Sequence, residues 1–472
     1  MKSLLVLATS TAFLLASFAV AQDSAPIVKS DVATTYGVDF SQVVGKIKPL
    51  NGINLWADFS SARIEDDQEL AVACNFSTSR LHDAAWDDDG MRVVDVHQIF
   101  ANLDADPSAP DNYYFEPTDD YLARILDAGV VPIYRLGTGI EHTKKPYFAK
   151  KPKDYAQYAE ICAGIVRHYV KGWANGKKWN LPYWEIWNEP NLVPNMWDDP
   201  DWNSYCDFYV VVAKRLRSEF PDIKIGGPAL THAGVDLLGK LIDCCKEENA
   251  PLDFLSWHCY PHEPKDVLDS PGVLRKLLNE KGFEKTELHL NEWHYFPCDW
   301  SDVQGGDPET ARKIYTSPEG VHGIDSAAFN DFVLTRWQDV PLDMANYYLF
   351  GNYHWGLFDE YGTPRPTYYS FVLFGKLVKS SSARVATIDE GGEIALIAGV
   401  DSDGGSKKLL VSAFKNSKQT PIQIRLNGVP ASGKVAVERI DADAPYAKSE
   451  LEYSNGVLEL PRVYSGVYLI SF

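Results

Sequence analysis

The chain has too few cysteines to be held together by disulfide bonds. Its 472 residues include seven, and the odd number leaves at least one unpaired within a monomer. Small secreted domains that depend on disulfides carry them far more densely. No two cysteines have the Cys-x-x-Cys spacing of a zinc site, and we predict no metal. The stability of the fold must therefore come from a packed core.

Acidic residues outnumber basic residues in this chain. The chain has 45 lysines and arginines against 65 aspartates and glutamates, a formal charge of −20. Such a protein repels nucleic acid and anionic lipid more than it attracts them. We predict no nucleic-acid partner and no membrane partner, and a neutral ligand fits best. The oligomeric state is open at this point.

An apolar run lies at the N-terminus. It follows Lys2, extends from Leu4 to Val20 and ends in Ala19-Val20-Ala21, which a signal peptidase could cut. We predict a signal peptide over residues 1–21 and a secreted or periplasmic protein. The alternative is an uncleaved membrane anchor, which needs about 20 firmly apolar residues. The run is shorter than that and rich in Ser, Thr and Ala.

Short apolar segments alternate with helical stretches over residues 47–381, which is typical of parallel strands joined by helices. We predict an α/β protein whose catalytic domain is a (β/α)8 TIM barrel. The predicted strands lie near Leu50–Trp56, Ala73–Leu81, Val130–Leu136, Tyr183–Trp187, Ile223–Pro228, Phe254–Tyr260, Glu287–Glu292 and Tyr347–His354. Helical patterns cover Asp154–Tyr169, Trp202–Phe220 and Thr367–Val378.

The pattern changes to period two from about Ser382 to the C-terminus. The predicted strands there include Ile394–Ala398, Leu409–Ala413, Ile422–Leu426 and Val467–Phe472. Pairs such as Asn427-Gly428 and Asn455-Gly456 supply the positive φ angles that hairpin turns need. We predict an antiparallel β-sandwich accessory domain over residues 382–472. The N-terminal segment 22–46 can add a strand to it.

Two glutamates stand where predicted barrel strands end, at the face that carries the active site in barrels of this kind. Strand alternation places Glu185, Trp187 and Glu189 on one face, with Glu189 at the rim. Glu292 ends the seventh strand, in phase with Leu290 beneath it. Either glutamate alone could be a surface carboxylate or a helix cap. Two of them across the barrel mouth are the paired carboxylates that glycosidic cleavage needs.

Three motifs resemble a known family. They are Trp187-Asn188-Glu189-Pro190-Asn191-Leu192, Arg80-Leu81-His82-Asp83 and Asn291-Glu292-Trp293. They are similar to those of glycoside hydrolase family 39, in the clan of retaining barrel enzymes, and the resemblance spans roughly residues 38 to 380. The family includes β-xylosidases and α-L-iduronidases.

The resemblance implies a role for each glutamate. Glu189 would be the acid/base and Glu292 the nucleophile, while Asn188 would hold the sugar 2-hydroxyl. No metal or organic cofactor is implied. The enclosed Glu189 should have a raised pKa, whereas Arg80 should lower the pKa of Glu292. The two carboxyl groups of a retaining enzyme should stand about 5 to 5.5 Å apart.

The resemblance also implies a sugar-binding subsite lined by His82, His258, Tyr260 and Trp355. His82 and His258 could instead be core histidines, and Trp355 could plug the barrel mouth. Arg80 should be buried, either holding Glu292 ionised or pairing with Glu185.

These observations together predict a secreted retaining glycoside hydrolase, specifically an exo-acting β-xylosidase that cleaves plant-derived oligosaccharides. Other retaining activities of the clan stay open, namely those of an α-L-iduronidase, β-glucosidase, β-galactosidase, α-L-arabinosidase or endo-glycanase. A carbohydrate-binding protein without turnover is the remaining alternative.

Overall fold

The computed structural model describes residues 36–57, 67–85, 92–141, 144–299, 301–302, 306–352, 355–389, 391–418 and 420–472. The predicted signal peptide lies outside these residues. Within them, no helix is both long enough and apolar enough to cross a membrane.

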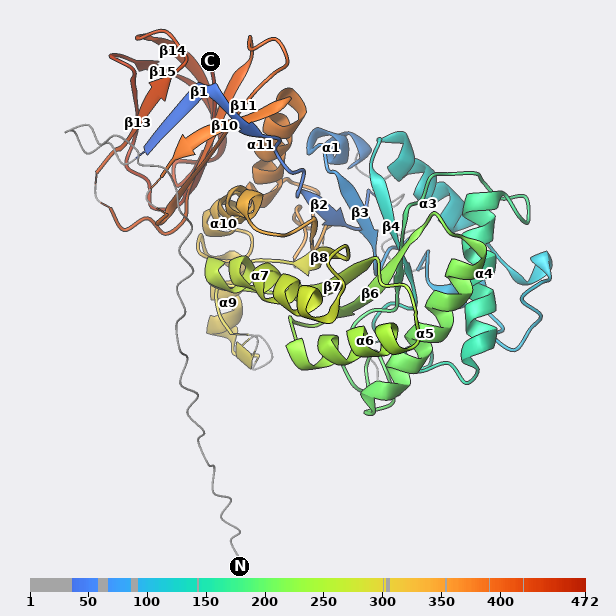
Figure 1. Cartoon of the computed structure of the whole chain (residues 1–472). Coiled ribbons are helices and arrows are strands. Elements are labelled where there is room, and N and C mark those ends of the chain that lie inside the picture. Colours follow the sequence, from blue (N-terminus) through green and yellow to red (C-terminus); the bar gives the residue numbers. More distant parts are fainter. Residues whose placement is uncertain are drawn as a thin grey trace, which may run out of the picture. The chain divides into compact units, whose positions relative to one another are not determined.

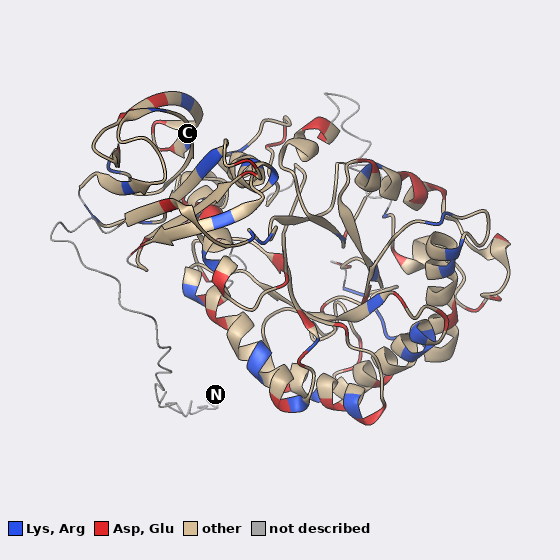
Figure 2. Ribbon diagram, turned by 45° about the horizontal axis from the view of Figure 1, so that its top comes forward, with Lys and Arg blue, Asp and Glu red and all other residues tan. Residues whose placement is uncertain are grey.

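A closed barrel of parallel strands forms the larger part of the structure (Figure 1), and β9 pairs with β2 to close it. Such strands are covered on both faces, by side chains inside the barrel and by helices outside. Figure 2 shows helices around the strands, with acidic and basic residues along them. The barrel strands are β2 Gly52–Asn54, β3 Thr78–Leu81, β4 Val131–Leu136, β5 Tyr183–Ile186, β6 Lys224–Leu230, β7 Phe254–Cys259, β8 Glu287–Trp293 and β9 Met344–Tyr347.

The helices between the strands have ordinary start and stop signals. Asp154 caps α4, accepting from the N–H groups of Ala156 and Gln157, and Gly172 ends it at a φ of 77°. The α-helices are α1 Asp67–Ala73, α2 Val96–Ile99, α3 Glu116–Asp127, α4 Tyr155–Lys171, α5 Trp202–Glu219, α6 Val235–Glu247, α7 Pro264–Lys281, α9 Pro308–Thr316, α10 Ile324–Arg336 and α11 Pro366–Ser380. Two 3-10 helices, η2 Pro110–Asn112 and η3 Trp337–Asp339, complete the set in the described residues.

A second, mostly antiparallel sheet follows α11, in the order β15-β14-β17-β12-β11-β10-β1-β13-β16. The N-terminal strand β1 pairs antiparallel with β10 and parallel with β13. One apolar cluster draws on strands from both halves of the sheet, and the edge strands β15 and β16 meet, so the sheet folds over a core of its own. Its strands are β1 Tyr36–Gly45, β10 Ala383–Ile388, β11 Ile394–Val400, β12 Lys407–Ala413, β13 Ile422–Asn427, β14 Gly433–Asp441, β15 Ala444–Tyr453, β16 Val457–Leu460 and β17 Gly466–Ser471.

The predicted fold class is confirmed, but two strand predictions are wrong in extent. The eighth barrel strand is β9 Met344–Tyr347 rather than Tyr347–His354. Leu349 and Phe350 are buried beyond its end, so the apolar pattern continues after the strand stops. The second strand begins at Thr78 rather than Ala73, because α1 extends to Ala73 and Asn75 has a φ of 49°.

Helix α10 is buried around its whole circumference, between the barrel and the second sheet. Ser412 on β12 donates to the carbonyl oxygen of Ala328, at 2.7 Å. Asp331 on α10 is fully buried, and neither of its carboxylate oxygens has a hydrogen-bond partner among the described residues. Burial raises the pKa of Asp331 well above its ordinary value, since nothing compensates the lost hydration.

Replacing Asp331 by Asn should therefore stabilise the protein, by about 1 to 3 kcal/mol at pH 7. The unfolded state releases the Asp331 proton near pH 4 and the folded state retains it to higher pH, so the penalty grows as pH rises. Thermal unfolding at pH 7 and pH 4 should show the larger gain at pH 7. Asp339, which pairs with Arg384 at 2.7 Å, is the matched control, and its Asn variant should gain nothing. An Asp331→Asn protein that melts at or below the wild-type temperature at pH 7 contradicts this account.

Candidate active site

Glu189 reaches the barrel mouth through a turn rather than through the strand before it. Strand β5 ends at Ile186, and both Trp187 and Glu189 have positive φ angles, of 71° and 44°. The prediction that Glu185, Trp187 and Glu189 share a face is wrong, because these left-handed residues break the alternation. The indole of Trp187 packs against Tyr158 on α4 and Phe208 on α5, outside the barrel strands, and donates to the carbonyl oxygen of Met196 at 2.7 Å.

Glu292 departs from the predicted strand phase. Trp257 on β7 pairs with Leu290 on β8, but the next residue, His258, pairs with Glu292, so the register shifts by one residue at Asn291. The prediction that Leu288 and Leu290 lie in phase beneath Glu292 is therefore wrong, although both are fully buried earlier on the strand. The Glu292 side chain keeps only a small opening to solvent. A carboxylate at this depth needs partners that offset its lost hydration.

His258, near the end of β7, stands between the two glutamates. Its Nδ1 is 2.7 Å from Oε1 of Glu189, and its Nε2 is 3.3 Å from Oε2 of Glu292. One oxygen of each carboxyl group and one ring nitrogen of His258 lie within 4.8 Å of one another. This spacing fits direct attack by one carboxylate and leaves no room for the intervening water of an inverting enzyme.

The glutamates differ in what surrounds them. Burial raises the pKa of Glu189 to about 7, with Arg80 opposing the shift and Asp83 adding to it. The pKa of Glu292 is raised as well, because burial outweighs the opposing effects of His258 and Arg80. Arg80 therefore acts on the pKa of Glu292 in the predicted direction, but burial outweighs it and the net shift is upward.

The proton that this pair shares near neutral pH resides on Glu189. Arg80 and Tyr260 both donate to Glu292, and these bonds favour its charged form. Burial lowers the pKa of His258 to about 4, so its ring is neutral. A neutral ring can accept from protonated Glu189 at Nδ1 and present its Nε2 proton to Glu292.

Arg80 on β3 is fully buried and organises the floor of the site. Its guanidinium donates to Glu185 at 2.7 Å, to Glu292 at 3.1 Å and to Oδ1 of Asn188 at 2.7 Å. Both alternatives stated for Arg80 therefore occur together. Sequence reasoning missed the further partners of Glu185, which accepts from Ser256 and Asn291.

Asn188 and Trp355 border the same space. Nδ2 of Asn188 is buried and has no hydrogen-bond partner among the described residues, so it can donate to a ligand hydroxyl. Trp355 packs against Tyr260, with ring centroids 5.6 Å apart. Because Tyr260 also donates to Glu292, Trp355 lies beside the carboxylate pair.

Two residues near His82, namely Asp83 and Tyr348, also lie at the barrel mouth, and sequence reasoning assigned no role to either. Nε2 of His82 is 3.4 Å from Oδ2 of Asp83, while its Nδ1 has no partner among the residues described. The hydroxyl of Tyr348 donates to Oδ2 of Asp83 at 3.2 Å. Tyr348 comes directly after β9, so the rule that strand ends carry the site could have found it, had the strand been predicted with the right end.

Glu189, His258 and Glu292 also have the atoms and spacing to hold a metal ion. The contacts above already use all three as a proton-sharing group, and the absence of a metal from the reaction stays a prediction.

The model of glycosyl hydrolases family 39 matches residues 78–452. A beta-xylosidase of Geobacillus stearothermophilus is 26% identical over 271 residues, which are 52% of this chain and 52% of that protein. The chain thus matches about half the length of this relative. A beta-xylosidase of Caldicellulosiruptor saccharolyticus is 24% identical over 397 residues, covering 78% of this chain and 75% of its own.

The fold has solved counterparts. The crystal structure of a glucosidase from Croceicoccus marinus is 20% identical, with a TM-score of 0.75, and the similarity covers 93% of this chain and 99% of that one. At this identity the likeness shows the shared fold alone.

Proposed function

The chain belongs to glycosyl hydrolases family 39, and from this premise we propose that it is a retaining glycosidase that acts on β-xylosides. The observation that carries the proposal is the close pair of Glu189 and Glu292, with Arg80 and Tyr260 donating to Glu292. The beta-xylosidases among its relatives support the choice of substrate. A sugar-binding protein without turnover has no need for two buried carboxyl groups in different protonation states.

In the first step the Glu292 carboxylate attacks the anomeric carbon. Glu189 gives its proton to the departing oxygen, and a covalent glycosyl-enzyme forms. Asn188 holds the 2-hydroxyl through its unpaired Nδ2, while Arg80 fixes the amide by donating to Oδ1. This bond becomes stronger as charge develops on the sugar ring.

In the second step the ionised Glu189 removes a proton from water, which attacks the same carbon and releases Glu292. Two inversions at one carbon retain the configuration. The hydrogen bond from Tyr260 and the contact with Arg80 stabilise the carboxylate that leaves.

The mouth favours a neutral sugar over a uronate. Asp83 is almost fully buried beside it and contributes to the raised pKa of Glu189. A second carboxylate carried by the substrate would be repelled by this group. We therefore rank a pentoside above an iduronide. Export from the cytoplasm is part of the proposal and depends on the N-terminal sequence alone.

Incubation with nitrophenyl β-xyloside, β-glucoside, β-galactoside, α-arabinoside and α-iduronide should show the highest kcat/KM on the xyloside. A glucoside carries a hydroxymethyl group at C5 where a xyloside carries hydrogen, and a group of this size in a fitted pocket gives an expected preference of about 10 to 200-fold. Preference for another glycoside changes the substrate but keeps the chemistry. Inactivity on every glycoside, with a folded protein, would falsify the proposed function.

A further inference from the structure

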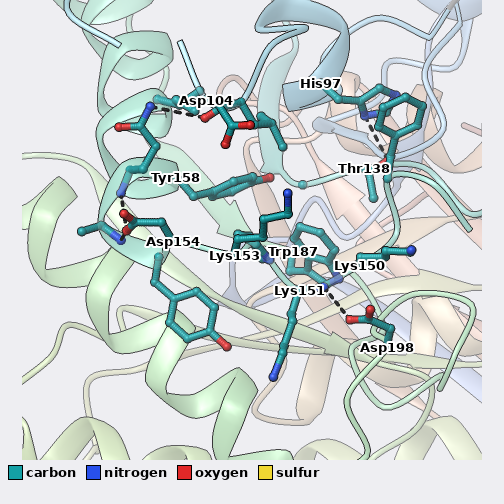
Figure 3. Close-up of a pocket in the computed structure, with 18 of the residues that line it drawn as sticks. His97, Asp104, Thr138, Lys150, Lys151, Lys153, Asp154, Tyr158, Trp187 and Asp198 are labelled. Atoms are coloured by element: carbon teal, nitrogen blue, oxygen red, sulfur yellow. Dashed lines mark hydrogen bonds between the residues drawn. The ribbon is translucent and has the colours of Figure 1, made fainter. Parts of the chain in front are cut away.

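An open pocket of about 900 Å³ lies beside the barrel mouth (Figure 3) and has no part in the chemistry described above. Gly137 and Thr138, which follow β4, and Trp187, which follows β5, form one side of it. The first turns of α4 form another, through Tyr155 and Tyr158. Because strand ends and helix starts meet at the C-terminal face, the pocket opens at the same end of the barrel as the glutamates.

Its rim carries two exposed aromatic rings. Tyr147 is 68% exposed and Phe148 is 47% exposed. Phe148 stacks on His97, with centroids 4.0 Å apart and planes 6° apart. One Glu141 oxygen accepts from the N–H groups of Tyr147, Phe148 and Ala149, at 2.6 to 3.1 Å, so this part of the loop is held in place. These hydrogen bonds hold the backbone, and stacking on His97 holds the Phe148 ring. The exposed faces of the two rings suit the apolar face of a sugar.

The polar lining is balanced in charge. Three lysines and three aspartates line the pocket, namely Lys150, Lys151, Lys153, Asp104, Asp154 and Asp198. Lys151 pairs with Asp199, and Asp154 caps α4. Lys150 and Lys153 form no ion pair within the described part of the chain, and Figure 3 shows Lys153 pointing toward the middle of the pocket. Balanced donors and acceptors beside aromatic rings favour a neutral, hydroxyl-rich ligand over an anion.

We propose that the pocket binds the leaving-group end of an oligosaccharide, with Tyr147 and Phe148 as its stacking surface and Lys150 and Lys153 as donors to sugar oxygens. The inference rests on the proposed function. Glu189 gives its proton to the leaving oxygen, so the leaving part of the chain lies on the Glu189 side. Trp187, in the pocket wall, precedes Glu189 by two residues, which span at most about 7 Å of backbone.

The consequence is a dependence on chain length. In the wild type, kcat/KM should rise from xylobiose to xylohexaose as more rings reach the pocket. The double variant Tyr147→Ala, Phe148→Ala should lose this rise, which amounts to about a tenfold loss on the longest chain. Its kcat/KM on nitrophenyl xyloside should not change. Tyr464, 54% exposed in the connection between β16 and β17, provides the matched control, because Tyr464→Ala should behave as the wild type.

Three results overturn the inference: a wild type with no rise along the series, a double variant with the same rise as the wild type, or an equal loss on the aryl xyloside. If the wild type cleaves no glycoside, the proposed function has failed, and the pocket is tested separately. Calorimetric titration with xylohexaose should then show binding that is about tenfold weaker in the double variant. Equal affinities of the wild type and the double variant for xylohexaose would contradict the proposed sugar-binding role of the pocket.

Discussion

Replacing Glu292 by Ala should lower kcat on an aryl xyloside by at least about ten-thousandfold, because the nucleophile and the covalent intermediate are both lost. Added azide should partly restore turnover by occupying the vacated space and attacking the anomeric carbon directly. The product should be a glycosyl azide of inverted configuration, since a single displacement has occurred.

The same strand offers the control for this variant. Glu287 lies at the other end of β8 and pairs with Lys224. Glu287→Gln should retain nearly all activity, although it removes one carboxylate from the same strand. A Glu292→Ala protein that keeps more than a small fraction of wild-type turnover, or that yields a retained azide, assigns the nucleophile elsewhere.

Glu189 should control the alkaline side of the pH profile. Its pKa of about 7 means that the proton needed for the leaving oxygen is lost as pH rises through neutrality. In the wild type, kcat/KM on a substrate with a poor leaving group should fall about tenfold for each pH unit above 7. On the acid side, protonation of Glu292 removes the nucleophile and lowers the rate again.

Replacing Glu189 by Ala should remove the alkaline limb and slow poor leaving groups by about a hundred to ten-thousandfold. A dinitrophenyl xyloside needs no protonation, so its first step should survive while hydrolysis of the intermediate becomes slow. Azide should accelerate that second step and give a product of retained configuration. The proposed role is contradicted if Glu189→Ala keeps the wild-type alkaline limb or if azide gives the inverted product.

The architecture could be predicted from the sequence because each domain has a repeated hydrophobic pattern. Eight apolar segments alternating with helical stretches predict the barrel, and strands of period two with Asn-Gly turns predict the second sheet. The first and last residues of individual strands could be predicted less well. The apolar run after Met344 does not stop where its hydrogen-bond ladder stops, so Tyr348 was counted within a strand instead of at the mouth.

The two glutamates could be predicted because each follows an apolar strand at the functional face. Their environment could not, since it depends on depth and on partners distant in the chain. Arg80 opposes the pKa shift of Glu292, but the sequence does not show that burial outweighs it. The sequence also does not show that one ring nitrogen of His258 contacts Glu189 and the other contacts Glu292. The left-handed backbone at Trp187 was not predictable either, and its side chain packs against α4 and α5 rather than beside Glu185.

The central claim is that Glu292 attacks the sugar directly while Glu189 supplies the proton. Proton NMR of the first sugar released from an aryl β-xyloside by the wild-type protein tests it most directly. The account predicts that β-xylose appears first and mutarotates afterwards to the equilibrium mixture. Release of α-xylose as the first product would contradict the retaining mechanism and the role of Glu292.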